Sequence, residues 1–125
     1  MKKLNVDFIS GEEWRTLPEY PNYMFSNLGR VYSFYRNKII QPYEYNIRTG
    51  YYRIDLSVDK KVIKVMIHRV IATAFHSNPD NKPIVHHIDH DVRNNKADNL
   101  MWVTPQEHKE FHKRKPRKNN KKIKK

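Results

Sequence analysis

The segment that decides the fold is IVHHIDHDVRNNKADNLMWVTPQEHKEFH, residues 84–112. Its short apolar runs at 84–86 and 100–103 predict two β-strands that can pair as a hairpin. Between them, residues 89–98 are polar and show no hydrophobic periodicity. Long irregular loops inside small domains are usually functional, so we expect this loop to carry chemistry.

The residues after the second apolar run carry the signals that start a helix. Thr104 is a good N-cap, Pro105 suits the first helical position, and Glu107 completes a capping box with Thr104. Pro116 does not fit comfortably inside a helix. We therefore predict a helix from Pro105 to about Lys113, directly after the hairpin.

Five of the seven histidines fall in the last third of the chain, at 86, 87, 90, 108 and 112. His108 and His112 are four residues apart, so they share one face of the predicted helix. His86 and His87 are neighbours on a strand, so their side chains point to opposite faces. If the helix folds back across the hairpin, His86 meets His108 and His112, and a ββα metal site results.

Such an arrangement divides two roles between His86 and His87, one holding a metal and the other facing a substrate. Phosphodiester hydrolysis requires this division, because a metal ion stabilises charge on the phosphate while a base removes a proton from water. Histidine suits the second role since its pKa lies near neutrality. A histidine pair four residues apart also occurs by chance, so spacing alone leaves surface or core histidines as an alternative.

The chain before this segment predicts a β-rich module followed by one helix. The clearest strand pair, 51–56 and 62–67, alternates for part of its length around a turn at 59–61. Apolar residues at 70, 71, 74 and 75 share one helical face. The other expected elements are strands at 24–26, 30–33 and 38–40 and a helix at 68–75.

These elements predict an α+β chain, forming one compact domain or two small modules that share a core. We expect a small N-terminal antiparallel β module followed by a ββα-metal motif. The expected division is a lead-in at 1–13, the β-rich module at 14–67, the helix and metal-binding core at 68–112, and a basic, flexible tail at 113–125.

Composition restricts the class of protein. The chain has no cysteine, which excludes disulfides and thiolate metal sites. No apolar run approaches the length of a transmembrane helix, and the N-terminus lacks the apolar stretch of a signal peptide. We therefore expect a cytoplasmic protein without a membrane partner.

Charge points to a polyanionic partner. The net charge is +12, and residues 113–125 carry nine Lys/Arg and no acid, which leaves only +3 on the rest of the chain. Nucleic acid is the commonest partner of so basic a protein. A basic tail can also serve only to solvate the chain, so charge alone does not identify the function.

The sequence resembles the HNH endonuclease family, particularly its phage and intron-associated homing members. The matching residues of the last third are Val85-His86-His87-Ile88-Asp89, Asn94-Asn95-Lys96, Asp98-Asn99-Leu100-Met101-Trp102-Val103-Thr104 and Glu107-His108. Earlier residues resemble the module that often precedes such domains: Trp14, Pro18, Tyr23, Ser26-Asn27-Leu28-Gly29-Arg30-Val31, Tyr51-Tyr52, His68-Arg69-Val70 and Ala74-Phe75. The resemblance covers roughly residues 13–112.

This resemblance implies a DNA endonuclease with an HNH ββα-metal core. It makes His87 the general base, His86 and His108 metal ligands, and Asn99 the residue that braces the loop and orients the base. Many homing members carry Asn at the position of His108, so this chain departs toward the all-histidine pattern of colicin-type nucleases, in which His112 can join the metal. One divalent ion is implied: Mg²⁺ or Mn²⁺, with Zn²⁺ or another transition metal favoured if three histidines bind.

Double-stranded DNA is the implied partner, bound by a monomer or weak dimer in the host cell of a phage or mobile element. Lys and Arg side chains would contact phosphates without reading sequence. The candidates are Arg30, Arg53, Arg69, Arg93 and Lys96, together with Lys113, Arg114, Lys115, Arg117 and Lys118 of the tail.

Three other functions remain open at this level. The chain could bind DNA without cutting it, around a structural metal site. It could be a small structural-metal domain that binds RNA or protein, in which case metal removal would unfold it. It could also be a basic ribosomal or packaging protein with incidental histidines. Asn99 favours the nuclease, because a structural zinc site does not require it.

Overall fold

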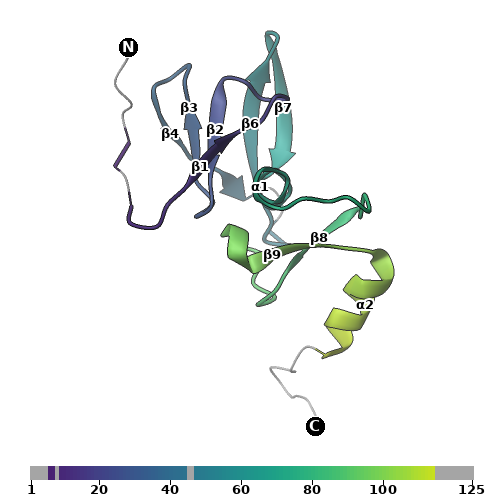
Figure 1. Ribbon diagram of the computed structural model, residues 1–125. Helices are drawn as coiled ribbons and strands as arrows, with labels where there is room; N and C mark the ends of the chain where they lie inside the picture. Colours follow the sequence, from purple (N-terminus) through teal and green to yellow (C-terminus); the bar gives the residue numbers. More distant parts are fainter. Residues whose placement is uncertain (1–5, 8, 45–46, 115–125) are drawn as a thin grey trace.

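The computed structural model describes residues 6–7, 9–44 and 47–114, and this part of the chain forms three small antiparallel sheets and two α-helices (Figure 1). The first sheet has the order β1-β2-β3-β4, and the second has the order β5-β6-β7. The bounds are β1 Trp14–Thr16, β2 Tyr23–Ser26, β3 Val31–Ser33, β4 Lys38–Ile40, β5 Tyr43–Glu44, β6 Tyr52–Val58 and β7 Lys61–Met66.

The remaining elements form the C-terminal part of the structure. Helix α1 (Ile67–Phe75) leads to the two-stranded sheet of β8 (Ile84–His87) and β9 (Leu100–Val103). The 3₁₀ helix η1 (Ala97–Asn99) directly precedes β9, and α2 (Pro105–Arg114) follows it. In Figure 1 the β8–β9 hairpin lies below the two N-terminal sheets, and α2 extends away from them.

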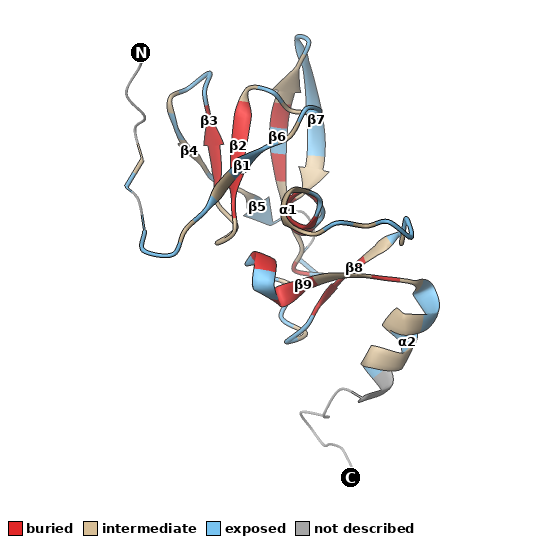
Figure 2. Cartoon of the chain, in the orientation of Figure 1, coloured by how far each residue is buried: buried red, intermediate tan, exposed pale blue. Residues whose placement is uncertain are grey.

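Helix α1 joins the two parts because it contacts β1, β2, β6 and β7 on one side and η1, β8 and β9 on the other. Its apolar spacing places Ile67, Val70 and Ile71 in the core. The same core cluster includes Phe25 from the first sheet and Leu100 from the hairpin. Figure 2 accordingly shows buried residues on β2, β3 and β6, on α1, and on β8 and β9. One core therefore spans both parts of the chain.

A tight turn between β2 and β3 connects the N-terminal part to the hairpin loop. Ser26 Oγ accepts hydrogen bonds from the backbone N–H groups of Leu28 and Arg30. Gly29 has φ 89°, and a Cβ built there would lie 3.0 Å from the backbone oxygen of Asn95. Only glycine combines this left-handed backbone with so close an approach. The β2–β3 turn thus packs directly against the loop of the candidate site.

The predicted α+β class is confirmed, and the elements agree closely with those predicted from sequence. The strands expected at 24–26, 30–33, 38–40, 51–56, 62–67, 84–86 and 100–103 all form, as do both helices. Asp59 and Lys60 have positive φ values of 50° and 67°, which makes them the turn between β6 and β7. No described helix has the length and apolar character needed to span a membrane.

Sequence analysis assigned no strand to β1 or β5 and expected an irregular loop where η1 forms. Strand β1 is three residues long and mostly exposed, and β5 is two residues long. Such short elements carry no periodicity, and pairing with a neighbouring strand defines them. The division of the chain at residue 67 stays a prediction.

Candidate metal centre and catalytic base

The hairpin and α2 are fixed to each other by a short connection and a complete cap. Strand β8 pairs with β9 so that His86 lies opposite Met101. At the start of α2, Thr104 Oγ1 accepts a hydrogen bond from the N–H of Glu107 at 3.0 Å, and Glu107 Oε1 accepts one from the N–H of Thr104 at 2.8 Å. The predicted capping box is therefore confirmed. It sets the direction in which α2 leaves β9 and crosses the hairpin.

Three predicted metal ligands come together on one face of the hairpin. Each of His86, His108 and His112 offers a ring nitrogen, and these nitrogens all lie within 4.8 Å of one another. The Nε2 atoms of His108 and His112 are 3.1 Å apart. Phe111 stacks on His86 with ring centroids 4.8 Å apart. A side chain from β8 and two from successive turns of α2 thus converge as predicted.

The electrostatics of this cluster favour neutral imidazoles. Burial, followed by the proximity of the other histidines, lowers the pKa of His86 to about 4. Burial and then the nearby His112 also lower the pKa of His108. Only unprotonated imidazole can bind a metal, so the lowered pKa values prepare His86 and His108 to accept a cation without first losing protons. Three convergent imidazole nitrogens are a donor set that suits a divalent transition metal.

His87 faces the opposite side of the hairpin, as strand geometry predicted. It is only 5% exposed, and its Nε2 lies 2.9 Å from Asn95 Oδ1. Because a carbonyl oxygen can only accept, Nε2 carries the hydrogen and Nδ1 keeps the free electron pair in the neutral ring. Burial lowers the pKa of His87, against the opposing effects of the Asn95 hydrogen bond and of Asp89 and Asp91. His87 is therefore neutral and able to take a proton at neutral pH.

Two aromatic neighbours complete the surroundings of His87. The ring centroid of His68 lies 5.1 Å from that of His87, and Tyr51 stacks on His68 at 5.0 Å. His68 is 8% exposed, and burial lowers its pKa to about 3, so it packs as a neutral ring. His68 comes from α1, and Tyr51 directly precedes β6. His87 is thus held from the N-terminal part of the chain as well as from its own loop.

Asn99 braces the loop through its own side chain. Its Oδ1 accepts the N–H of Asp89 at 3.0 Å, and its Nδ2 donates to Asp89 Oδ1 and to the backbone oxygen of Asn94, both at 2.9 Å. Asp89 in turn accepts the N–H of Asp91 and the Nδ2 of Asn94. These bonds fix the turn that follows β8.

A different asparagine makes the side-chain hydrogen bond to His87. Asn95 is hydrogen-bonded to His87, whereas the side chain of Asn99 acts on the loop. Sequence analysis gave Asn95, His68 and Tyr51 no individual role. Their presence among the residues that resemble the family was the available signal.

The cationic candidates differ in how their side chains are used. Arg30 donates to Glu12 at 2.8 Å and lies over the Trp14 ring, so its guanidinium is engaged within the fold. Arg93 pairs with Glu44 at 2.8 Å but keeps a side chain that is 56% exposed. Arg53 lies over the Tyr43 ring. Arg69 donates a hydrogen bond to the backbone oxygen of Pro83 and lies over the Trp102 ring. Lys96 is exposed.

The tail candidates receive no structural description. Lys113 and Arg114 lie in the last turn of α2, where side chains are not described. Lys115, Arg117 and Lys118 lie outside the described residues. Their contacts with phosphates stay predictions.

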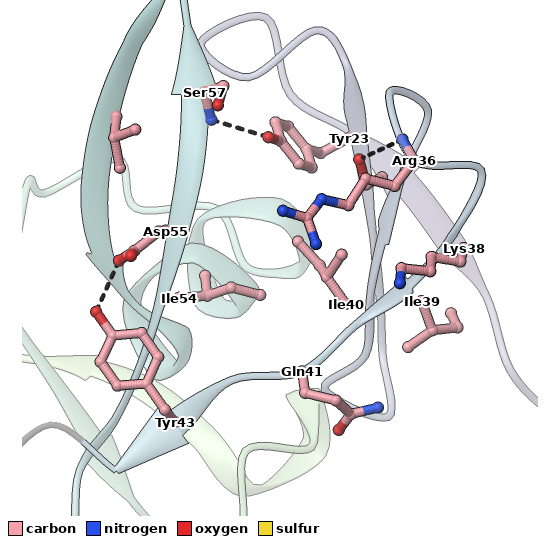
Figure 3. Close-up of a pocket in the computed structure, with 12 residues that line it drawn as sticks. Tyr23, Arg36, Lys38, Ile39, Ile40, Gln41, Tyr43, Ile54, Asp55 and Ser57 are labelled. Carbon is pink, nitrogen blue, oxygen red and sulfur yellow. Dashed lines mark hydrogen bonds between the residues drawn. The ribbon is translucent and has the colours of Figure 1, made fainter.

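A separate cleft of about 550 Å³ lies between the first and second sheets (Figure 3). Arg36 and Lys38 contribute its charged groups from one side, and Asp55, hydrogen-bonded to Tyr43, lies on the other. No histidine lines this cleft. Its one carboxylate, Asp55, accepts a hydrogen bond from Tyr43, and it offers no donor set for a transition metal, so the histidine cluster remains the candidate catalytic site.

Two family models match consecutive parts of the chain. The model described as HNH endonuclease matches residues 65–110, and the model described as NUMOD4 motif matches residues 12–69. The two matches overlap where β7 passes into α1.

Related proteins come from viruses. An uncharacterised HNH endonuclease of Acanthamoeba polyphaga mimivirus is 36% identical over 73% of this chain and 27% of its own length. The H-N-H endonuclease F-TflII of Escherichia phage T5 is 31% identical over 78% of this chain and 51% of its own length. The DNA endonuclease I-HmuI of Bacillus phage SP01 is 34% identical over 74% of this chain and 52% of its own length.

A solved structure that concerns DNA binding and cleavage by the HNH homing endonuclease I-HmuI also matches. Its TM-score is 0.73 at 31% identity, covering 81% of this chain and 57% of that chain. The hairpin, the braced loop and the histidine-bearing helix define the ββα-metal class of site. With these matches, the chain belongs to the HNH endonuclease family, and its relatives include phage homing endonucleases. It spans about a quarter to a half of the length of these curated relatives.

Proposed function

We propose that this protein is a metal-dependent DNA endonuclease that hydrolyses phosphodiester bonds. The observation that carries the proposal is the division of labour on β8. His86 joins a three-histidine cluster on one face, and its neighbour His87 is held by Asn95 on the other. The relatives named for DNA cleavage support the same activity.

His87 is the proposed general base. Its Nδ1 takes a proton from the attacking water, while Nε2–H stays bound to Asn95. This hydrogen bond keeps the ring in one orientation and one tautomer, and it raises the pKa of His87 against the effect of burial. Asn99 acts on His87 indirectly, because its side chain holds the turn at Asp89 that follows β8.

His86, His108 and His112 would hold one divalent cation. When bound, such an ion supplies charge stabilisation for the scissile phosphate and the departing 3′ oxygen. Three imidazoles favour a transition metal such as Zn²⁺ over Mg²⁺ or Mn²⁺, which prefer oxygen ligands.

DNA would be bound mainly through phosphates. Exposed Lys96 and Arg93 lie on the loop that connects β8 to β9, and Arg69 lies on α1. We propose that these three, with the basic tail, place the DNA across the hairpin. One site per copy favours a monomer or weak dimer that nicks one strand at a time. We expect it to act in the cytoplasm of the host cell.

The test uses supercoiled plasmid incubated with the protein and Mg²⁺, Mn²⁺ or Zn²⁺. We expect conversion to open circles, which EDTA and the substitution His87→Ala abolish. The substitution Lys61→Ala, at the exposed first residue of β7, serves as the matched control and should cut normally. If wild-type protein binds plasmid but cuts neither it nor a range of other DNA sequences with any of these metals, the non-cleaving DNA-binding alternative replaces our proposal.

A further inference from the structure

A fourth histidine adjoins the metal cluster and is used by none of the roles above. His90 lies in the loop after β8, and its N–H donates to the backbone oxygen of His87 at 2.9 Å. Its ring centroid lies 5.1 Å from that of His86 and 5.4 Å from that of His112. His90 is partly exposed and belongs to a loop, whereas the other three histidines belong to a strand or a helix.

The backbone at His90 is unusual for a residue with a side chain. Its φ is 64°, in the left-handed region that glycine adopts without cost and other residues adopt uncommonly. Several turn residues share this conformation, among them Asn37 and Asn81. An imidazole side chain does little to stabilise such a turn, so we expect its role to lie in the groups that the ring contacts.

The ring spacing agrees with a shared ion. Imidazoles bound to one tetrahedral metal through nitrogens about 2.0 Å from it have ring centroids about 5 Å apart. The separations of 5.1 and 5.4 Å place His90 near this value. The three pairs among His86, His108 and His112 are 5.7, 4.4 and 6.1 Å apart. His90 is not in the group whose nitrogens lie within 4.8 Å of one another, so its ring has to turn toward them.

We propose that His90 is a fourth histidine ligand of the metal held by His86, His108 and His112, and that it leaves the metal when DNA binds. The inference rests on the proposed function, since it assigns a further ligand to that site. Four imidazoles would close a tetrahedral site, whereas catalytic sites keep one position open for water or substrate. His90 is the one member of the set that lies outside a strand or helix, so rotation of its side chain can free its position for a phosphate oxygen of DNA while the braced turn stays in place.

The consequence is a site that retains its metal without DNA. A three-histidine site offers its open position to water and to competing chelators, and a fourth imidazole fills it. The arrangement also restrains hydrolysis until a phosphate arrives. Arg93 and Lys96, on the same loop, are exposed and can bring the phosphate backbone to the loop that carries His90.

The direct test counts imidazoles around the metal in the whole 125-residue chain. X-ray absorption of the Zn²⁺ form should give four histidine ligands in the wild type and three plus an oxygen in His90→Asn. Asparagine tolerates the left-handed backbone, so the turn is kept. The substitution His112→Asn is the matched control for losing one ligand. Competition with a chromophoric chelator should show Zn²⁺ affinity reduced by at least about tenfold in both variants.

Displacement is tested with a short DNA duplex added to the Co²⁺ form of His87→Ala, which cannot cut. The visible absorption of Co²⁺ should shift as one imidazole is replaced by oxygen. The double variant His87→Ala/His90→Asn should show no such shift in absorption, because it has no fourth imidazole to lose. Three histidine ligands in the wild type, with unchanged Zn²⁺ affinity in His90→Asn, overturn the fourth-ligand proposal while leaving the nuclease proposal intact. A wild type that cuts DNA with Mg²⁺ but binds no Zn²⁺ overturns it as well. Failure to cut DNA with four histidines still bound overturns only the nuclease.

Discussion

Replacing Asn95 by alanine removes the oxygen that accepts the hydrogen bond of His87 Nε2 at 2.9 Å. Both side chains are more than 90% buried, so water cannot easily replace the lost acceptor. Leaving a buried donor unpaired costs about 1–3 kcal/mol. If the lost free energy is the one that keeps His87 in its reactive orientation, the rate of cleavage drops about fivefold to a hundredfold.

The prediction has a second part that a purely structural role would not produce. The Asn95 hydrogen bond raises the pKa of His87, so its loss lowers that pKa further. The substitution Asn95→Asp has the opposite effect, since a carboxylate favours the protonated ring, and it should move the acidic limb of the pH–rate profile upward. We expect the acidic limb to move in opposite directions in the two variants, with kcat affected more than KM.

The assay follows plasmid nicking between pH 5 and 9 at saturating metal, with urea unfolding and Zn²⁺ affinity measured in parallel. Both variants should bind the metal as the wild type does, because Asn95 lies on the face of the hairpin away from the three-histidine cluster. An unchanged pH–rate profile and kcat in Asn95→Ala, with cleavage still dependent on His87, would refute the reasoning that Asn95 orients the base.

Three further outcomes are expected. Burial lowers the pKa of His68 to about 3, so this group does not affect the free energy of unfolding above about pH 6.5. Below that pH the free energy of unfolding should fall, by about 2 kcal/mol at pH 5, because the unfolded chain binds the proton first. Urea unfolding at pH 8 and pH 5 should show a smaller fall in His68→Gln. Gly29→Ala should lower the free energy of unfolding by about 1–3 kcal/mol, because the new Cβ would press on the Asn95 backbone and φ is 89°. Equal melting temperatures for the variant and the wild type would contradict this packing. Thr104→Ala should cost about 1 kcal/mol and weaken Zn²⁺ binding, because the cap positions α2, with Thr104→Ser as the control that retains both.

The elements that sequence predicted well are those whose signal is local. The capping box needs only Thr104 and Glu107, and its geometry forms as expected. The i, i+4 spacing of His108 and His112 and the alternation of a strand at His86 fix which side chains can meet. Their convergence within 4.8 Å follows once the connection from β9 to α2 is short.

The contacts that sequence could not predict depend on tertiary structure. Sequence gave no sign that Arg30 pairs with Glu12, 18 residues away, or that Arg93, which stays exposed, also pairs with Glu44, 49 residues away. A polar loop without periodicity gives no indication of which asparagine will face His87. Positions of this kind are decided by how distant segments pack, and a single sequence does not encode that in any local pattern.

The packing that decides the position of Asn95 comes from the other half of the chain. The backbone oxygen of Asn27, in the β2–β3 turn, accepts the N–H of Ala97 at 2.7 Å, and Gly29 lies against the Asn95 backbone. Asn95 then holds His87. A continuous series of contacts therefore runs from the N-terminal sheet to the base. Gly29→Ala in the β2–β3 turn should therefore reduce the cleavage rate while leaving Zn²⁺ affinity unchanged, which would show that the N-terminal module contributes to catalysis through the position of the proposed base.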